Sequence, residues 1–144
     1  MVDSRKIFLI AGAVLLVDQL LKVAVVKVQP QVTLIPNILG INYTTNTGIA
    51  FGLFQGYNLL LIGVSLIVIA FILHYYRKLK DKLEFYAIAF ILGGTLGNLV
   101  DRILRGTVVD YITLSRIPTF NIADAALTIG AALIIIAYLK EKFD

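Results

Sequence analysis

The sequence contains no cysteine, no tryptophan and one histidine, and only 15% of its 144 residues are charged. Without cysteine the chain can form no disulfide, no thiol nucleophile and no cysteine-based metal site. The lone His74 cannot supply the H-E-x-x-H pair of a membrane metallopeptidase. The serines Ser4, Ser65 and Ser115 stand in no G-x-S-x-G setting, and no Walker-type phosphate loop is present. We therefore expect neither metal nor cofactor, and carboxylate chemistry remains.

Hydrophobic residues make up 59% of the chain, and the mean hydropathy is +0.90. Soluble globular domains contain roughly 45 to 50% apolar residues. The composition therefore predicts one integral membrane domain over residues 1–144.

Four apolar stretches are long enough to span a bilayer, which takes about 20 residues. They cover residues 7–26, 59–76, 83–100 and 122–139. The first resembles a signal peptide in its basic start, but no small-x-small cleavage site follows, so we expect a retained helix.

Basic residues flank these stretches in a pattern that predicts topology. They are Arg5, Lys6, Arg77, Lys78, Lys80, Lys82, Lys140 and Lys142. With four spans all of them fall on one face, which the positive-inside rule makes cytoplasmic, so both termini are expected inside. The net charge of +4 is not gathered into a patch with interleaved aromatics, so we expect no nucleic-acid partner.

The other two connections, residues 28–55 and 105–120, are then extracytoplasmic. The stretches "ILGINYTT" and "TVVDYITL" have β character. Because open strand edges cannot lie in hydrocarbon, we expect a small extracytoplasmic sheet at or above the outer headgroups.

This topology brings unusual polar residues together near the outer leaflet. They are Asp18, Lys22, Asn98, Asp101, Arg102, Asp110, Asn121 and Asp124, with Ala123 and the stretch "NTGIAFG" beside them. Structural roles compete with site roles for several of them. Asp18 and Lys22 can neutralise each other as an i, i+4 pair. Asp101 can pair with the adjacent Arg102.

Asn98 can form an interhelical hydrogen bond, and Asn121 can cap the last helix.

Asp110 and Asp124 differ because no opposite charge is adjacent to either in sequence. Two aspartates that share a site lose their protons in two coupled steps, so one stays protonated while the other is charged. The charged one can take a proton from an attacking water, and the protonated one can donate to the carbonyl oxygen and then to the leaving nitrogen.

The ordered motifs "VDQLLK", "NTGIAF", "GGTLGNLVDR", "VVDY" and "FNIADAALTIG" resemble the lipoprotein signal peptidase family, also called signal peptidase II. The resemblance implies a four-helix protein of the bacterial cytoplasmic membrane with an extracytoplasmic β cradle. It further implies an aspartyl endopeptidase that cleaves prolipoproteins before a diacylglyceryl-modified cysteine at the outer leaflet. The implied partners are these lipid-modified signal peptides and membrane phospholipids, and we expect a monomer.

By motif, the resemblance makes Asp110 and Asp124 the catalytic pair. The supporting residues that it implies are Asp18, Lys22, Asn46, Gly48, Ala50, Asn98, Asp101, Arg102, Asn121 and Ala123. The sequence departs from the family pattern at Ile49 and Thr95, where alanine is common, and in the short segment 113–119 between the two aspartates.

Two non-peptidase interpretations compete with this one. A small proton-coupled or lipid-handling transporter would use the aspartates as a relay, but it would need polar residues at several depths, and the cytoplasmic half is nearly bare. A membrane scaffold that packs its helices through "GGTLG" would leave the two isolated aspartates without a purpose.

Overall fold

The computed structural model describes residues 5–48, 56–79 and 81–143. Its helices are α1 (Arg5–Val28), α2 (Asn58–Tyr75), α3 (Lys82–Arg105) and α4 (Ile122–Phe143), and a 3-10 turn, η2 (Tyr76–Lys78), follows α2. All four helices are long and apolar enough to cross a membrane. The four apolar stretches predicted from the sequence thus each form one long helix, which begins and ends close to the predicted stretch.

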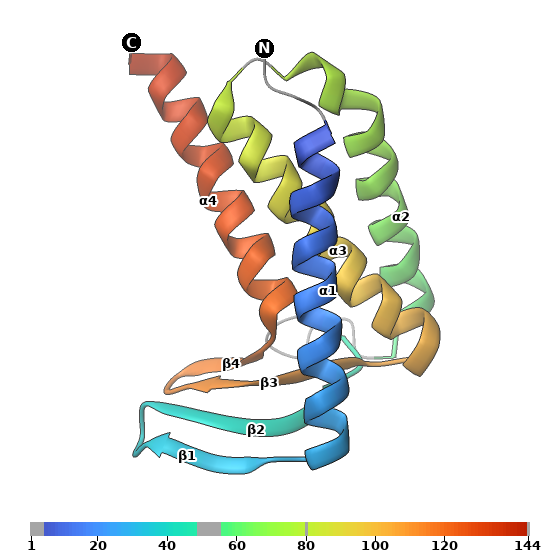
Figure 1. Ribbon diagram of the computed structural model, residues 1–144, viewed down its shortest axis with the longest axis vertical. Coiled ribbons are helices and arrows are strands. Elements are labelled where there is room, and N and C mark those ends of the chain that lie inside the picture. Colours follow the sequence, from blue (N-terminus) through green and yellow to red (C-terminus); the bar gives the residue numbers. More distant parts are fainter. Residues whose placement is uncertain (1–4, 49–55, 80, 144) are drawn as a thin grey trace.

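Helix α3 lies at the centre of the bundle, with α1, α2 and α4 around it (Figure 1). In its most apolar 18-residue stretch, 61% of the residues are buried. In the corresponding stretches of the other three helices the share is 17 to 22%. The outer helices expose large apolar side chains such as Leu9 and Ile67, both 70% exposed. Such a surface is stable in hydrocarbon and unstable in water, which makes this a multi-pass membrane protein.

Four short strands form one antiparallel sheet in the order β1-β2-β3-β4. They are β1 (Gln31–Ile35), β2 (Leu39–Asn46), β3 (Val108–Leu114) and β4 (Ile117–Phe120). In the middle of the sheet β2 pairs with β3, and Thr44 lies opposite Asp110. This pairing joins the two helix connections for which the sequence predicted β character. The predicted small sheet is therefore present, and it lies across one end of the bundle, away from the C-terminal end of α4 (Figure 1).

Local signals fix where α3 begins and ends. The Asp81 side chain accepts hydrogen bonds from the backbone N–H groups of Leu83 and Glu84, as an N-cap does. Gly106 ends the helix at φ 74°, in the left-handed region that glycine adopts without strain. The chain then turns directly into β3, which places Asp110 beside the end of α3.

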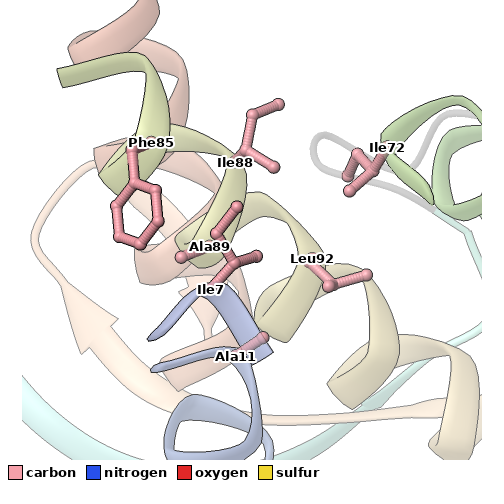
Figure 2. Close-up of a cluster of buried hydrophobic side chains, with 7 residues drawn as sticks. All are labelled: Ile7, Ala11, Ile72, Phe85, Ile88, Ala89 and Leu92. Carbon is pink, nitrogen blue, oxygen red and sulfur yellow. The ribbon is translucent and has the colours of Figure 1, made fainter. Parts of the chain in front are cut away.

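A buried apolar cluster joins α1, α2 and α3 at the end of the bundle far from the sheet (Figure 2). Its members are Ile7, Ala11, Ile72, Phe85, Ile88, Ala89 and Leu92. A second cluster of Val25, Val109 and Tyr111 packs the end of α1 against β3. The bundle is thus apolar at one end, and the sheet is fixed to it at the other.

Candidate active site

Buried polar side chains gather where α1, α3 and α4 meet the sheet. They are Asp18, Lys22, Asn98, Asp101, Asp110 and Asn121. A buried polar group without a partner costs several kcal/mol, so each of these must be hydrogen-bonded or ion-paired.

The start of α4 carries a reciprocal capping arrangement. The Asp124 backbone N–H donates to Asn121 Oδ1 at 2.8 Å, and the Asn121 backbone N–H donates to Asp124 Oδ2 at 3.2 Å. This is the geometry of a capping box, with Asp124 in the position that glutamate usually takes. The expected cap role of Asn121 is therefore present, and it holds the Asp124 carboxyl group in place.

Side-chain amides link the two aspartates that stand apart in sequence. Asn121 Nδ2 donates to Asp110 Oδ1 at 2.7 Å, so one asparagine contacts both carboxyl groups. Asn98 Nδ2 donates to Asp124 Oδ1 at 2.8 Å, the predicted interhelical bond. Asn46 Nδ2, from the end of β2, donates to Asp110 Oδ2 at 3.1 Å. Both oxygens of Asp110 therefore accept hydrogen bonds from side-chain amides. Asp124 accepts one from the Asn98 amide and one from the backbone N–H of Asn121.

An ion cluster with three fully buried members, Asp18, Lys22 and Asp101, lies behind these amides. Lys22 Nζ is 2.9 Å from Asp18 Oδ2, the predicted i, i+4 pair, and 3.0 Å from Asp101 Oδ2. Arg105 also pairs with Asp101. Gln19 Nε2 donates to both Asp18 and Asp101. The cluster ties α1 to the half of α3 that lies nearer the sheet.

The ion cluster also orients the amides. Lys22 Nζ donates to Asn98 Oδ1 at 3.0 Å, and because an ammonium only donates, the Asn98 NH₂ group must face Asp124. Asp18 Oδ1 accepts the backbone N–H of Ala123 at 2.9 Å, which holds the first turn of α4 against α1. The predicted Asp18–Lys22 pair therefore has both a structural role and a contact with the site.

Arg102 is not the partner of Asp101 that its neighbouring position suggested. The ion pairs of Asp101 are with Lys22 and Arg105, while Arg102 Nη2 donates to the carbonyl of Gly48 at 3.3 Å. Adjacent residues on a helix point about 100° apart, so Asp101 faces α1 and Arg102 faces the loop after β2. The Gly48 backbone N–H in turn donates to the Asn46 side chain at 2.9 Å.

The carboxyl group of Asp110 titrates far from its ordinary range. Burial, and after it the negative charge of Asp124, raise the pKa of Asp110 to about 7. Hydrogen bonds from Asn46 and Asn121 favour the ionised form and limit the rise. Near neutral pH, Asp110 is therefore able both to hold and to release a proton.

Both aspartates line one pocket of about 820 Å³. Its floor is the α3 stripe of Ile91, Thr95, Asn98 and Arg102, spaced as one helix face. Side chains of α2 and α4 form the walls, and the sheet contributes Leu114 and residues 117–120. Within the described residues, no group of three or more histidines, cysteines or acids is arranged to hold a metal ion.

The sequence did not single out two residues of the ion cluster. Gln19 and Arg105 complete the ion cluster, and Gln19 could have been found as a further polar residue directly after Asp18 in an apolar helix. Ala50, which the resemblance included among the supporting residues, lies outside the residues that the structure describes, as does Ile49. The other predicted site residues all lie at the sheet end of the bundle.

The fold and the site define a multi-pass membrane enzyme of the aspartic type, in which two carboxyl groups share an apolar pocket. Comparison with known proteins agrees. Residues 10–140 match the family model described as signal peptidase (SPase) II. The chain therefore belongs to the signal peptidase II family, a family of aspartic peptidases.

Individual relatives cover nearly the whole chain. The lipoprotein signal peptidase of Halothermothrix orenii is 38% identical over 140 residues, which is 94% of this chain and 96% of that protein. That of Geobacillus thermodenitrificans is 39% identical over 138 residues, 90% and 86% of the two chains. A solved bacterial membrane enzyme superposes with a TM-score of 0.90 at 33% identity, covering 96% of this chain and 90% of its own.

Proposed function

We propose that this protein removes the signal peptide from diacylglyceryl-modified prolipoproteins by hydrolysing the bond before the lipidated cysteine, with Asp110 and Asp124 as the catalytic pair. Membership of the signal peptidase II family supports the peptidase activity and the prolipoprotein substrate. The observation that carries the residue assignment is Asn121, which hydrogen-bonds both carboxyl groups at the edge of one apolar pocket.

In the mechanism that we propose, the pair shares one proton: Asp110, whose pKa is raised to about 7, holds it at the start, and Asp124 acts as the base. Asp124 takes a proton from the attacking water, whose oxygen bonds to the peptide carbon, while Asp110 donates its proton to the carbonyl oxygen. The tetrahedral intermediate then breaks at its C–N bond. The leaving nitrogen takes the proton that Asp124 received from the water, and the proton on oxygen returns to Asp110, which restores the starting state. The donor to the nitrogen is thus Asp124 and not, as the sequence alone suggested, the carboxyl group that is protonated at the start.

The remaining site residues hold this pair in register. Asn98 and Asn121 present N–H groups to the carboxylates, and the buried Lys22 fixes the orientation of the Asn98 amide. Arg102 holds the backbone at Gly48, at the mouth of the pocket. Asp18 and Asp101 neutralise Lys22, and Ala123 is small enough for α3 and α4 to approach closely.

The groove floored by α3 is suited to the substrate's signal helix. Its intramembrane part is lined by Leu61, Val64, Val68, Ile91 and Leu127, which match an apolar helix lying in the bilayer. The sheet would then lie over the outer leaflet as a cradle, both termini would be cytoplasmic, and residues 1–144 would act as one monomeric domain in the bacterial cytoplasmic membrane. The basic residues at the helix ends far from the sheet, such as Arg5, Arg77 and Lys140, support this orientation by the positive-inside rule.

The test is a cleavage assay in lipid, with a diacylglyceryl-modified prolipoprotein beside its unmodified twin. We expect wild type to cleave only the modified substrate, and Asp110→Asn and Asp124→Asn each to lower kcat by at least about a thousandfold, in line with loss of a general acid or base. Arg105→Gln serves as a comparison: it removes one ion pair of Asp101 and leaves the carboxyl groups of Asp110 and Asp124 intact. Activity that survives either dyad substitution, or equal cleavage of both substrates, would refute the proposal.

A further inference from the structure

All the serine and threonine residues of the four helices line the same pocket. They are Ser65 on α2, Thr95 on α3 and Thr128 on α4, and the sequences of α1 to α4 contain no other. Three helices thus each bring one hydroxyl to a cavity whose walls are otherwise mostly aliphatic. We call these three residues the hydroxyl collar.

The collar residues lie at one depth. At the sheet end, Asn58 Nδ2 of α2 donates to the Arg102 carbonyl of α3 at 3.2 Å. Ser65 lies seven positions from Asn58, and Thr95 lies seven positions from Arg102, on helices that run in opposite directions. At 1.5 Å per residue both are about 10 Å from that contact, on the side away from the sheet.

The third hydroxyl reaches the same level from α4. Asn98 and Asp124 are hydrogen-bonded to each other, Thr95 lies three positions from Asn98, and Thr128 lies four positions from Asp124. Thr95 and Thr128 are therefore each about one helical turn, roughly 5 Å, beyond the catalytic pair. The hydroxyl collar forms a polar level directly beneath the two carboxyl groups.

These hydroxyls keep unused hydrogen-bonding capacity. Ser65 Oγ donates to the Leu61 carbonyl and Thr128 Oγ1 to the Asp124 carbonyl, each at 2.9 Å, so their lone pairs remain available as acceptors. Thr95 is buried and its hydroxyl has no hydrogen bond to any described residue. The hydroxyl collar thus offers acceptors on two sides and a hydroxyl that can donate or accept on the floor.

A peptidase that acts on a membrane helix has a use for such a level. The scissile bond must be extended to reach the two aspartates, and the unwound residues lose their intrahelical hydrogen bonds. In hydrocarbon each unsatisfied N–H or C=O costs several kcal/mol. An acyl chain or an intact helix has no free polar group to place at this depth.

We propose that the hydroxyl collar binds the main-chain N–H and C=O groups of the substrate residues immediately before the scissile bond, once these leave the signal helix. This inference rests on the proposed function and names how its site receives an unwound backbone. Because the contacts are to main chain, the collar selects an extended conformation and not a particular side chain.

The experiment measures binding, so that it does not depend on turnover. A diacylglyceryl-modified signal lipopeptide is titrated against the inactive Asp124→Asn protein in nanodiscs, with and without Ser65→Ala, Thr95→Val and Thr128→Val. We expect each substitution to raise Kd about fivefold and the triple combination at least about tenfold, the scale of lost hydrogen bonds. Thr113→Val, on β3 and outside this pocket, is the matched control and should leave Kd unchanged.

A second lipopeptide, with an ester in place of the amide one residue before the scissile bond, separates hydrogen bonding from packing. The ester lacks the N–H, so the collar substitutions should weaken its binding less than they weaken binding of the amide peptide. An unchanged Kd in the triple variant, or equal losses for both peptides, would overturn the inference. If wild type fails to cleave the amide peptide while the difference between peptides persists, the proposed function falls and the collar remains a binding site.

Discussion

At the scale of single residues, the side chain of Asn121 both caps helix α4 and forms part of the candidate active site. Its Oδ1 accepts the Asp124 N–H, which starts α4, and its Nδ2 donates to Asp110, 2.7 Å away on β3. The two roles that the sequence left as alternatives are compatible, because an amide has a separate donor and acceptor. In the same way, the amide oxygen of Asn98 accepts a hydrogen bond from Lys22 while its NH₂ group donates one to Asp124.

The pKa of Asp110 predicts a pH dependence of the activity. Below about pH 7 the Asp110 carboxyl group keeps its proton, and as pH rises through that value the proton is lost. An ionised Asp110 cannot donate to the carbonyl oxygen, so kcat/KM should fall about tenfold per pH unit on the alkaline side. Initial rates on lipidated substrate between pH 5.5 and 9, with a thermal-stability control at each pH, measure this. A flat profile up to pH 9 would contradict the assignment of the acid to Asp110.

Replacing the buried lysine predicts a large loss of stability. Lys22→Met leaves Asp18 without an ion pair and Asp101 with Arg105 alone, both within a membrane bundle. Removing one partner of a buried ion pair costs about 3–5 kcal/mol. Thermal unfolding in detergent should show this loss, and the double variant Lys22→Met/Asp18→Asn should recover part of it, because the neutral amide can still accept the Ala123 N–H. A double variant no more stable than the single one would show that charge burial is not the cause.

At the scale of elements, α3 organises the bundle because its faces serve different partners. Glycines at 93 and 97 allow α1 to approach, and the glycine at 94 allows α4 to approach. A Cβ on Gly93 would lie 2.7 Å from Val14, and one on Gly97 would lie 2.6 Å from Asp18 Oδ2. The remaining face, free of such close packing, becomes the floor of the pocket.

The close contact between α3 and α4 predicts the effect of a single methyl group. In Gly94→Ala the new Cβ would lie 2.5 Å from the Ala123 carbonyl oxygen, so the start of α4, and with it Asp124, must move. We expect a loss of about 1–3 kcal/mol, as for overpacked cores, and a larger relative fall in kcat than in KM. Gly63→Ala on α2 is the control, since nothing lies within 4 Å of its added Cβ, and it should keep both stability and activity. Equal behaviour of the two variants would contradict close α3–α4 packing.

At the scale of the whole molecule, the sheet and the bundle are parts of one site. Asp110 comes from β3, Asp124 from α4, and the amides between them from α3, β2 and the α4 cap. The second apolar cluster, in which Val25 of α1 packs with Val109 and Tyr111, fixes the sheet to the helices. The geometry of the proposed catalytic pair therefore depends on the position of the sheet over the bundle end.

The absence of cysteine provides a direct test of how the whole molecule crosses the membrane. Single cysteines at Asn37 and Ser115, in the turns after β1 and β3, should react with a membrane-impermeant maleimide added to intact cells. A cysteine at Glu141, near the end of α4, should react only after the membrane is permeabilised. The opposite pattern would place the sheet and the active site in the cytoplasm. Retained cleavage activity of each variant shows that the labelled protein is folded.

Hydropathy alone determined the four spanning helices, because burial in lipid requires about 20 apolar residues whatever they pack against. Alternation and turn residues likewise predicted β character around Asp110. The sequence also identified Asp18, Lys22 and the isolated aspartates as unusual, since charges near hydrocarbon need a reason.

The sequence could not determine which side chains these polar residues contact. Asp101 pairs with Lys22 and Arg105 instead of its neighbour Arg102, and the hydroxyls of α2, α3 and α4 meet at one depth. Both depend on how each helix is rotated and shifted along its axis, which only close packing between distant segments decides.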